Sequence, residues 1–502
     1  MNRRQFLGLL GTGAAAVTTG QIGRALAAAP LGTFLPAQAG ERDPAALLIA
    51  RLTFGVTPAL YAHVQQIGAQ AFIDEQLAPE SLDDGAVESR LAPYQTILAQ
   101  NGGLLAQQYQ KKRQTVTGAL LGSTTLRAAY SERQLYERMV HFFSDHFSLF
   151  IGKAQVLFLK VDDDRDAIRP YALGHFREIL GASAHSPAML IFLDNARSDK
   201  RAPNENYARE LMELHTLGVN GGYSEDDVKA VARAFTGWSV QGAKQSSDGR
   251  TIYRFRPGFH DRDAKMILGQ AIPAGGTESD GETMLDILAG HPSAAQFIST
   301  KLVRRFVSDD PPTALVDACA QTFTSSGGAI RAVLRTIFAA DEFWSAPPKF
   351  KQPYEYTVSL LRALNADVQD DTRFLRGMQK PLQAMGQIPF TWPAPNGFPD
   401  VGAYWMSNLL PRWNMAITVA GDQLPGTKID MNGLVDLLDA NNIPLEAEPV
   451  LLFLATYLFG RPLSTAERDA VLQFAADTAS EPAAQIGAGL SLLLAAPAFQ
   501  YK

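Results

Sequence analysis

The sequence of 502 residues contains a single cysteine, Cys319. One thiol can neither close a disulfide within the chain nor supply a cysteine-based metal site. Long hydrophobic runs are also missing, because the two longest after residue 30, 449–460 and 489–499, are far shorter than the roughly 20 residues that span a membrane. We therefore expect no stable membrane anchor.

The chain has no excess of basic charge and no familiar catalytic signature. Lys and Arg total 45 against 51 Asp and Glu, so the formal charge of −6 gives no general affinity for nucleic acid. The nucleophile-elbow G-x-S-x-G, the phosphate-binding G-x-x-x-x-G-K-[ST] and the zinc motif H-E-x-x-H do not occur. These absences exclude the common hydrolase, nucleotide-binding and zinc-protease patterns.

The N-terminus has the pattern of an export signal. Arg3 and Arg4 precede a weakly apolar, acid-free stretch rich in Gly and Ala, and small residues near Ala29 suit a signal peptidase. A transmembrane anchor is the alternative, but the stretch is too short and too polar for it. Residues 1–29 are therefore predicted to be a twin-arginine signal peptide, and the protein to be periplasmic or secreted through the twin-arginine export machinery.

Helical periodicity dominates the rest of the chain. The clearest helix begins after Ser224, which can cap it, and Ser464 starts a capping box further on. The strand signal is confined to 251–255 and 265–268, which we expect to pair as one hairpin across the turn at Pro257. We predict a mainly α fold, a large multi-helical assembly with one small inserted β-hairpin. An irregular arm (30–43) should lead into a helical core domain (44–430), with a C-terminal helical subdomain (431–502) packed on it.

The densest polar segment is the predicted helix 203–218. At 100° per residue, Glu205, Arg209, Glu210 and Glu213 fall on one arc, whereas His215 falls on the apolar side. Three carboxylates and an arginine could hold a divalent cation or position an acid and a base. They could equally form a solvated face with salt links one turn apart. The cofactor is thus unknown, with a divalent cation as one candidate.

Two other segments carry candidate histidines. In 137–147, a stripe of Glu137, His141 and Asp145 has metal-binding chemistry but lacks a ligand from a second element, and His146 points away from it. The second segment is the turn between the predicted strands, whose candidates are His260, Asp261 and Lys265. Aspartates at a turn also form local hydrogen bonds, so a structural role is open for Asp261.

The segment PNENYARELMELHTLGVNGGYSEDDVKAVARAFTGW (203–238) resembles the signature of the bacterial family called domain of unknown function 1800. Further similar segments follow the same order, among them ERMVHFFSDHF, HDRDAKMILG and KQPYEYTVSLLRAL. The resemblance implies an exported bacterial protein, often encoded beside a sulfatase-like protein, and assigns no residue a role. The family pattern includes His146, His260, Asp261 and Lys265 but not His141, which favours His146 over the neighbouring stripe.

Two functions from different classes are compatible with these patterns. The first is a hydrolase or transferase acting on an envelope or extracellular polymer, with the glutamates as acid, base or metal ligands and His146 or His260 carrying protons. The alternative is a non-catalytic helical scaffold or secretion partner of the sulfatase-like protein, with the same residues as a packed ion-pair network. In either case, Glu205, Arg209, Glu210 and Glu213 are expected to meet His146 and the 260–265 turn in one polar cluster.

Export is expected to depend on the arginine pair. Replacing Arg3 and Arg4 together by lysine should leave the precursor in the cytoplasm, because the twin-arginine route is read from these residues. Cell fractionation followed by immunoblotting measures the distribution. Normal export of the double variant, or loss of export when only the general secretory route is blocked, would contradict the assignment.

Overall fold

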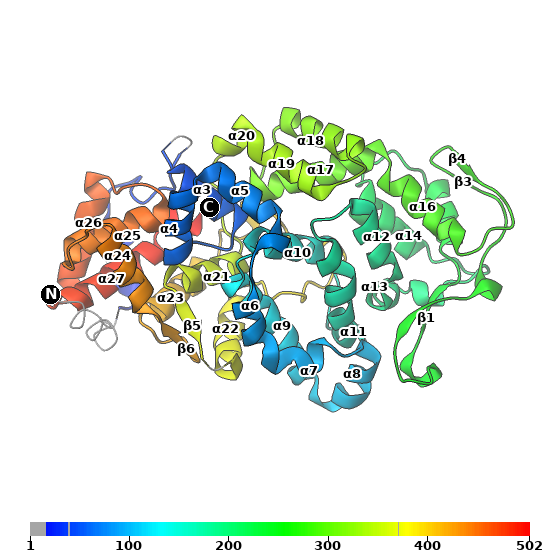
Figure 1. Ribbon diagram of the computed structural model, residues 1–502, viewed down its shortest axis with the longest axis horizontal. Helices are drawn as coiled ribbons and strands as arrows, with labels where there is room; N and C mark the ends of the chain where they lie inside the picture. The colour runs from blue at the N-terminus through cyan, green and yellow to red at the C-terminus, as the bar shows by residue number, and fades with distance from the viewer. Residues whose placement is uncertain (1–16, 39–40, 370) are drawn as a thin grey trace.

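Helices make up most of the chain, which confirms the mainly α class. The computed structural model describes residues 17–38, 41–369 and 371–502 (Figure 1), so the predicted signal residues Arg3 and Arg4 lie outside the described part. Within the predicted signal segment, helix α2 (Thr19–Ala28) is described and packs against α23 and α27. No helix in the described ranges is both long and apolar enough to cross a membrane.

The first half of the chain forms helices that run from α3–α5, left of centre in the view, through the middle to α12–α14 on the right (Figure 1). They are α3 (Pro44–Leu52), α4 (Pro58–Ile67), α5 (Ala69–Leu77), α6 (Gly85–Leu91), α7 (Gln95–Leu98), α8 (Gly102–Tyr109), α9 (Arg113–Tyr130), α10 (Gln134–His146), α11 (Val156–Asp162), α12 (Phe176–His185), α13 (Pro187–Phe192), α14 (Glu205–Glu210) and α15 (Glu225–Ala234). π-Helical turns extend α11 over Asp163–Ile168 (η4) and α14 over Leu211–Thr216 (η7).

The second half continues in the same manner. Its helices are α16 (Ser279–Ala289), α17 (Pro292–Phe306), α18 (Thr313–Ser325), α19 (Ile330–Ala339), α20 (Asp341–Trp344), α21 (Pro353–Ala363), α22 (Asp371–Met385), α23 (Leu409–Ala420), α24 (Met431–Ala440), α25 (Ala447–Phe459), α26 (Thr465–Thr478), α27 (Pro482–Ala495) and α28 (Pro497–Gln500). The predicted caps are present: Ser224 and Ser464 accept from the backbone N–H of Asp227 and Glu467. Between α9 and α10 the helical run is interrupted at Ser131, whose hydroxyl accepts the N–H of Arg133 in place of a helical bond.

The strands pair differently from the prediction. The two predicted strands exist, but β2 (Ile252–Phe255) pairs with β1 (Trp238–Gln241), and β3 (Lys265–Ile267) pairs with β4 (Gln270–Ile272). The predicted hairpin, in which 251–255 (β2) pairs with 265–268 (β3), was therefore wrong. The cause is the dipeptide Leu268-Gly269, whose positive φ angles of 49° and 76° make a tight hairpin turn directly after β3. A third two-stranded sheet joins β5 (Ala366–Val368) to β6 (Thr427–Ile429).

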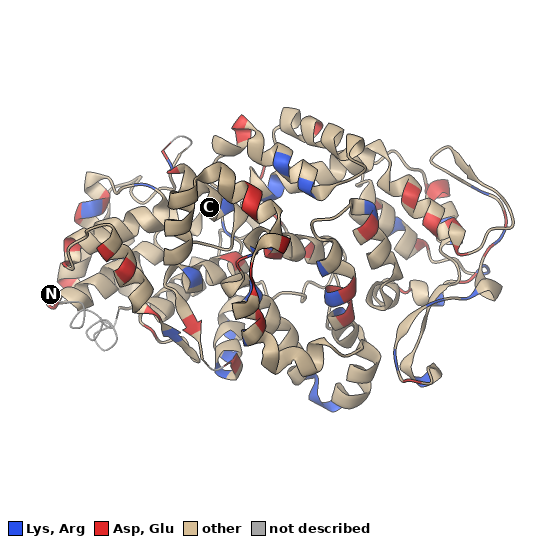
Figure 2. Cartoon of the chain, viewed as in Figure 1, with Lys and Arg blue, Asp and Glu red and all other residues tan. Residues whose placement is uncertain are grey.

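One continuous hydrophobic core runs through the molecule, from α2 to α28. Figure 1 shows α25, α26 and α27 at one end and α16 with the β3–β4 hairpin at the other, while α10 and α21 lie between them. The C-terminus returns to the centre beside α3. Acidic and basic residues are interspersed over these elements (Figure 2).

The Pro- and Trp-rich segment 386–400 forms an irregular connection that packs on the end of α10. The backbone N–H of Ile151 donates to Phe390 O at 3.0 Å, and the rings of Trp392 and Phe398 lie tilted against each other with their centroids 5.1 Å apart. At Gly397, φ is +71°, and a Cβ atom would lie 2.2 Å from the carbonyl oxygen of Asp145. Only glycine permits this approach.

Replacing Gly397 by alanine should therefore destabilise the fold. The left-handed backbone and the clash with α10 together should lower the free energy of unfolding by about 2–5 kcal/mol, measured by urea denaturation. Gly242→Ala is the matched control, because Gly242 has a φ of −73° and open space around it. Equal urea midpoints for Gly397→Ala and Gly242→Ala would show that segment 386–400 does not pack closely against α10 at Gly397.

Candidate functional site

The helix that carries the candidate glutamates begins at Asn204, whose side chain accepts the N–H of Tyr207 at 3.1 Å. From Leu211 the helix has π geometry, in which Leu217 N–H donates to Met212 O five residues earlier. On this wider turn Thr216 lies in the interior, where its hydroxyl donates to Leu211 O at 2.7 Å. His215 is buried, in agreement with its predicted core position.

The four charged residues of this helix face outward. Arg209 forms a two-pronged ion pair with Glu225 of α15, with both N···O distances 2.7 Å. Glu205 is exposed, and Glu210 and Glu213 are partly exposed. Partial burial and the neighbouring Glu213 raise the pKa of Glu210. The arrangement is that of a solvated face held by salt links.

His146 lies at the C-terminal end of α10, away from those carboxylates. Lys301 Nζ donates to its Nδ1 at 2.8 Å, and its Nε2 donates to the carbonyl oxygen of His215 at 3.0 Å. Burial and the Lys301 charge hold the pKa of His146 well below its ordinary value. Burial also lowers the pKa of Lys301 to about 8. His146 is thus a neutral ring that joins α10, α17 and η7.

His260 and Lys265 belong to a second buried group, centred on Asp280 of α16. Asp280 Oδ2 lies 2.8 Å from Lys265 Nζ and 3.2 Å from His260 Nε2. Lys265 Nζ also donates to the carbonyl oxygens of Asp261 and Asp263 at 2.7 and 2.9 Å, so all three of its N–H donors are used. The carboxylate of Asp261 pairs with Arg233 through two bonds of 2.8 and 3.0 Å.

The candidate residues therefore fall into three groups. Among the residues that the structure describes, no hydrogen bond or ion pair joins the Glu205–Glu213 face to the side chain of His146 or to the His260–Lys265 turn. The single polar cluster expected from the sequence is not formed, because α14 directs its charges to solvent and to α15, whereas His260 and Lys265 turn toward α16.

The stripe of Glu137, His141 and Asp145 on α10 does not form one group either. Glu137 forms a bidentate ion pair with Arg169 at 2.9 and 3.1 Å. His141 stacks on Tyr354, and burial together with Arg305 lowers its pKa to about 3. Burial raises the pKa of Asp145 to about 7. In the described ranges, no group of three or more His, Cys, Asp or Glu side chains is arranged to hold a metal ion.

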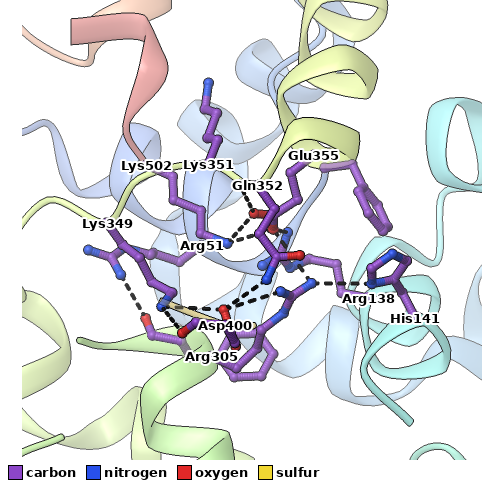
Figure 3. A network of polar contacts seen from close by, with 12 residues as sticks. Arg51, Arg138, His141, Arg305, Lys349, Lys351, Gln352, Glu355, Asp400 and Lys502 are labelled. Carbon is purple, nitrogen blue, oxygen red and sulfur yellow. Dashed lines mark hydrogen bonds and ion pairs between the residues drawn. The ribbon is translucent and has the colours of Figure 1, made fainter. Parts of the chain in front are cut away.

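The largest buried ion network lies elsewhere, around Glu355 of α21 (Figure 3). Glu355 pairs with Arg138 of α10 and accepts two bonds from Lys502 Nζ, at 2.5 and 2.7 Å. Burial alone would raise the pKa of Glu355, but Arg138, Lys502 and Arg305 outweigh it and hold the pKa well below its ordinary value. We call the following six residues the central network: Arg138, Arg305, Lys349, Glu355, Asp400 and Lys502.

Asp400 forms the second anionic centre of the central network. Lys349 Nζ lies 3.4 Å and Arg305 Nη1 3.6 Å from its Oδ1, and Gln352 donates to the same oxygen at 3.2 Å (Figure 3). Lys349 also pairs with Asp309. The segment 386–400 is thereby fixed to α17 and to the start of α21.

A small cavity of about 50 Å³ adjoins the central network. Its walls come from α3, α10, α21, the end of α25 and the C-terminal residues 498–502. Its charged lining residues are Arg42, Arg138, Lys351, Glu355 and Lys502. A polar, cation-rich cavity at the junction of five segments is the second candidate site in the molecule.

Comparison with known proteins supports the family resemblance. The model of the family described as protein of unknown function (DUF1800) matches residues 47–501, nearly the whole chain. The chain belongs to the DUF1800 family. No curated protein and no solved structure matches the chain.

The matched DUF1800 region contains five of the six residues of the central network, all but Lys502, and the sequence reasoning selected none of the six. A signal for it is present in the sequence, because Glu355 is the only acid in the segment that forms α21 and stands between Tyr354 and Tyr356. A lone acid in an apolar helix needs a cation from another element when it is buried. The sequence alone does not identify Lys502 or Arg138 as those cations.

Breaking the Asp280 group should cost stability. Asp280→Asn removes the nearer of the two carboxylates beside the buried Lys265, which keeps only Asp261 at 3.8 Å, and we expect the free energy of unfolding to fall by about 3–5 kcal/mol, measured by urea denaturation. Glu225→Gln is the control, since it breaks an exposed pair with Arg209 and should leave the midpoint almost unchanged. An unchanged midpoint for Asp280→Asn would remove the structural role of the group.

Proposed function

We propose that this DUF1800 protein is an exported, non-catalytic helical scaffold that binds a sulfatase-like protein encoded nearby. The observation that carries the proposal is the state of the candidate acids and bases. Lys265, His260 and Asp280 satisfy one another in the interior, and Arg209 is paired with Glu225. A general acid or base must instead reach a substrate proton.

A binding role is further supported by exposed apolar side chains. Five of the eleven large hydrophobic side chains that are exposed in the described residues lie within the ten positions 401–410. They are Val401, Tyr404, Met406, Leu409 and Leu410, which we call the 401–410 patch; Leu410 is 58% exposed. Apolar groups gathered on a surface are typical of protein interaction sites.

A hydrolase or transferase acting on an envelope or extracellular polymer is the second candidate. It rests on Glu210, whose pKa is raised by partial burial and by Glu213, as a general acid requires. Under this alternative, Glu210→Gln abolishes turnover of the polymer and changes stability little. Under the scaffold proposal, the same variant leaves partner binding unchanged.

The proposal is tested by mixing the purified protein with the purified sulfatase-like protein. We expect a complex by size-exclusion chromatography with light scattering and a measurable heat in calorimetry. Tyr404→Asp with Leu410→Asp should weaken the affinity at least about tenfold, because charge is placed in an apolar interface (about 1.4 kcal/mol per factor of ten). Met266→Asp is the control, since Met266 is 59% exposed but lies on β3, outside the 401–410 patch.

Absence of a complex with the unaltered protein would overturn the scaffold proposal. A complex that forms equally well with the double variant would remove the 401–410 patch as its surface. Polymer turnover that is lost on Glu210→Gln would establish the enzyme instead.

A further inference from the structure

The cavity beside the central network is lined by more basic than acidic side chains. The basic side chains are Arg42, Arg138, Lys351 and Lys502, and the one acidic side chain is Glu355. Glu355 is already engaged by Arg138 Nη1 and by Lys502. Because uncompensated charges are costly to remove from water, this lining favours an anion inside the cavity.

The two arginines that line the cavity have buried hydrogen-bond donors without an acceptor in the described part of the chain. The Nε and Nη1 atoms of Arg42 and the Nε and Nη2 atoms of Arg138 are buried and make no hydrogen bond within the described protein. Arg138 is 1% exposed, so water at the surface does not satisfy these donors. A buried donor without an acceptor costs roughly 1–3 kcal/mol, and an acceptor in the cavity would relieve that cost.

Lys351 completes the set of cations from a third segment. It stands just before α21. Among the described residues, its Nζ donates one hydrogen bond, of 3.3 Å, to Ser359 Oγ, and it lies 3.8 Å from the centre of the Phe499 ring. Burial lowers the pKa of Lys351 to about 7 and that of Arg42 to about 10. Burial is the larger cause of both shifts; the charge of Arg461 adds to the shift of Arg42, whereas Glu355 opposes that of Lys351.

The size and the walls of the cavity limit the anion. One water needs roughly 10–15 Å³ of such space, so about 50 Å³ admits a small ion but not a polymer segment. The remaining walls include Ile49, Tyr457 and Phe459, which exclude water and strengthen charge-assisted hydrogen bonds.

We propose that this cavity binds one tetrahedral oxyanion, phosphate or sulfate, held by Arg42, Arg138 and Lys351. The three cations come from the segment before α3, from α10 and from the segment before α21. Four oxygens arranged as a tetrahedron accept from several directions at once, whereas a carboxylate offers two oxygens on one side. The bound ion links the N-terminal helices, α10, α21 and the C-terminal residues, and this site is independent of the proposed partner surface.

The first test measures the melting temperature of the purified protein in phosphate- and sulfate-free buffer. Adding 10 mM phosphate or sulfate (about a hundredfold above an expected dissociation constant) should raise the midpoint by about 5 °C relative to chloride at equal ionic strength. Isothermal titration of each ion gives the affinity and shows which of the two is preferred; preference for either supports the site. A melting midpoint in phosphate and in sulfate equal to that in chloride would overturn the proposal.

The second test locates the site. Arg42→Gln and Lys351→Met should each abolish the thermal shift, whereas Arg468→Gln, which changes an exposed arginine paired with Glu448, should keep it. A full shift in both cavity variants would overturn the proposal. Should either variant fail to fold, anomalous scattering from selenate in crystals of the unaltered protein decides: a peak beside Arg138 supports the site, and peaks confined to the surface refute it.

Discussion

The buried carboxylate of Glu355 is the point on which the centre of this fold depends. It forms ion pairs with Arg138 of α10, with Lys502 of the C-terminal segment and with Arg305 of α17, and so connects these three elements to α21. Removing such a carboxylate would leave several cations buried without a partner, a loss that exceeds that of an ordinary hydrogen bond. The positions of the irregular segment 386–400 and of the small cavity both follow from this arrangement.

The fold was predictable from the sequence wherever local chemistry determines it. Capping residues such as Ser224 and Ser464 mark helix starts because their side chains satisfy backbone N–H groups within the same turn. Strand partners were not predictable in this way: Trp238–Gln241 lies outside the two strand signals of the sequence, and only its packing in the folded protein makes it the partner of β2. Local pattern determines an element, and long-range packing determines its neighbour.

The candidate site was predictable only in part, for the same reason. A helical wheel correctly placed Glu205 and Arg209 on a common polar face and His215 in the core. The wheel does not show that Arg209 pairs with Glu225 rather than with His146. It also does not show that the π-helical turn places Thr216 in the interior. Charged side chains reach partners that lie far apart in the sequence, so the composition of an arc does not reveal what it faces.

The long separation of the partners in the central network also has a consequence for the rate of unfolding. Arg138 and Glu355 are 217 residues apart and Glu355 and Lys502 are 147 apart, so these pairs form only after large loops have closed. Contacts that form after the folding transition state mainly slow unfolding. The central network is therefore placed to slow unfolding and so to lengthen the lifetime of the native state.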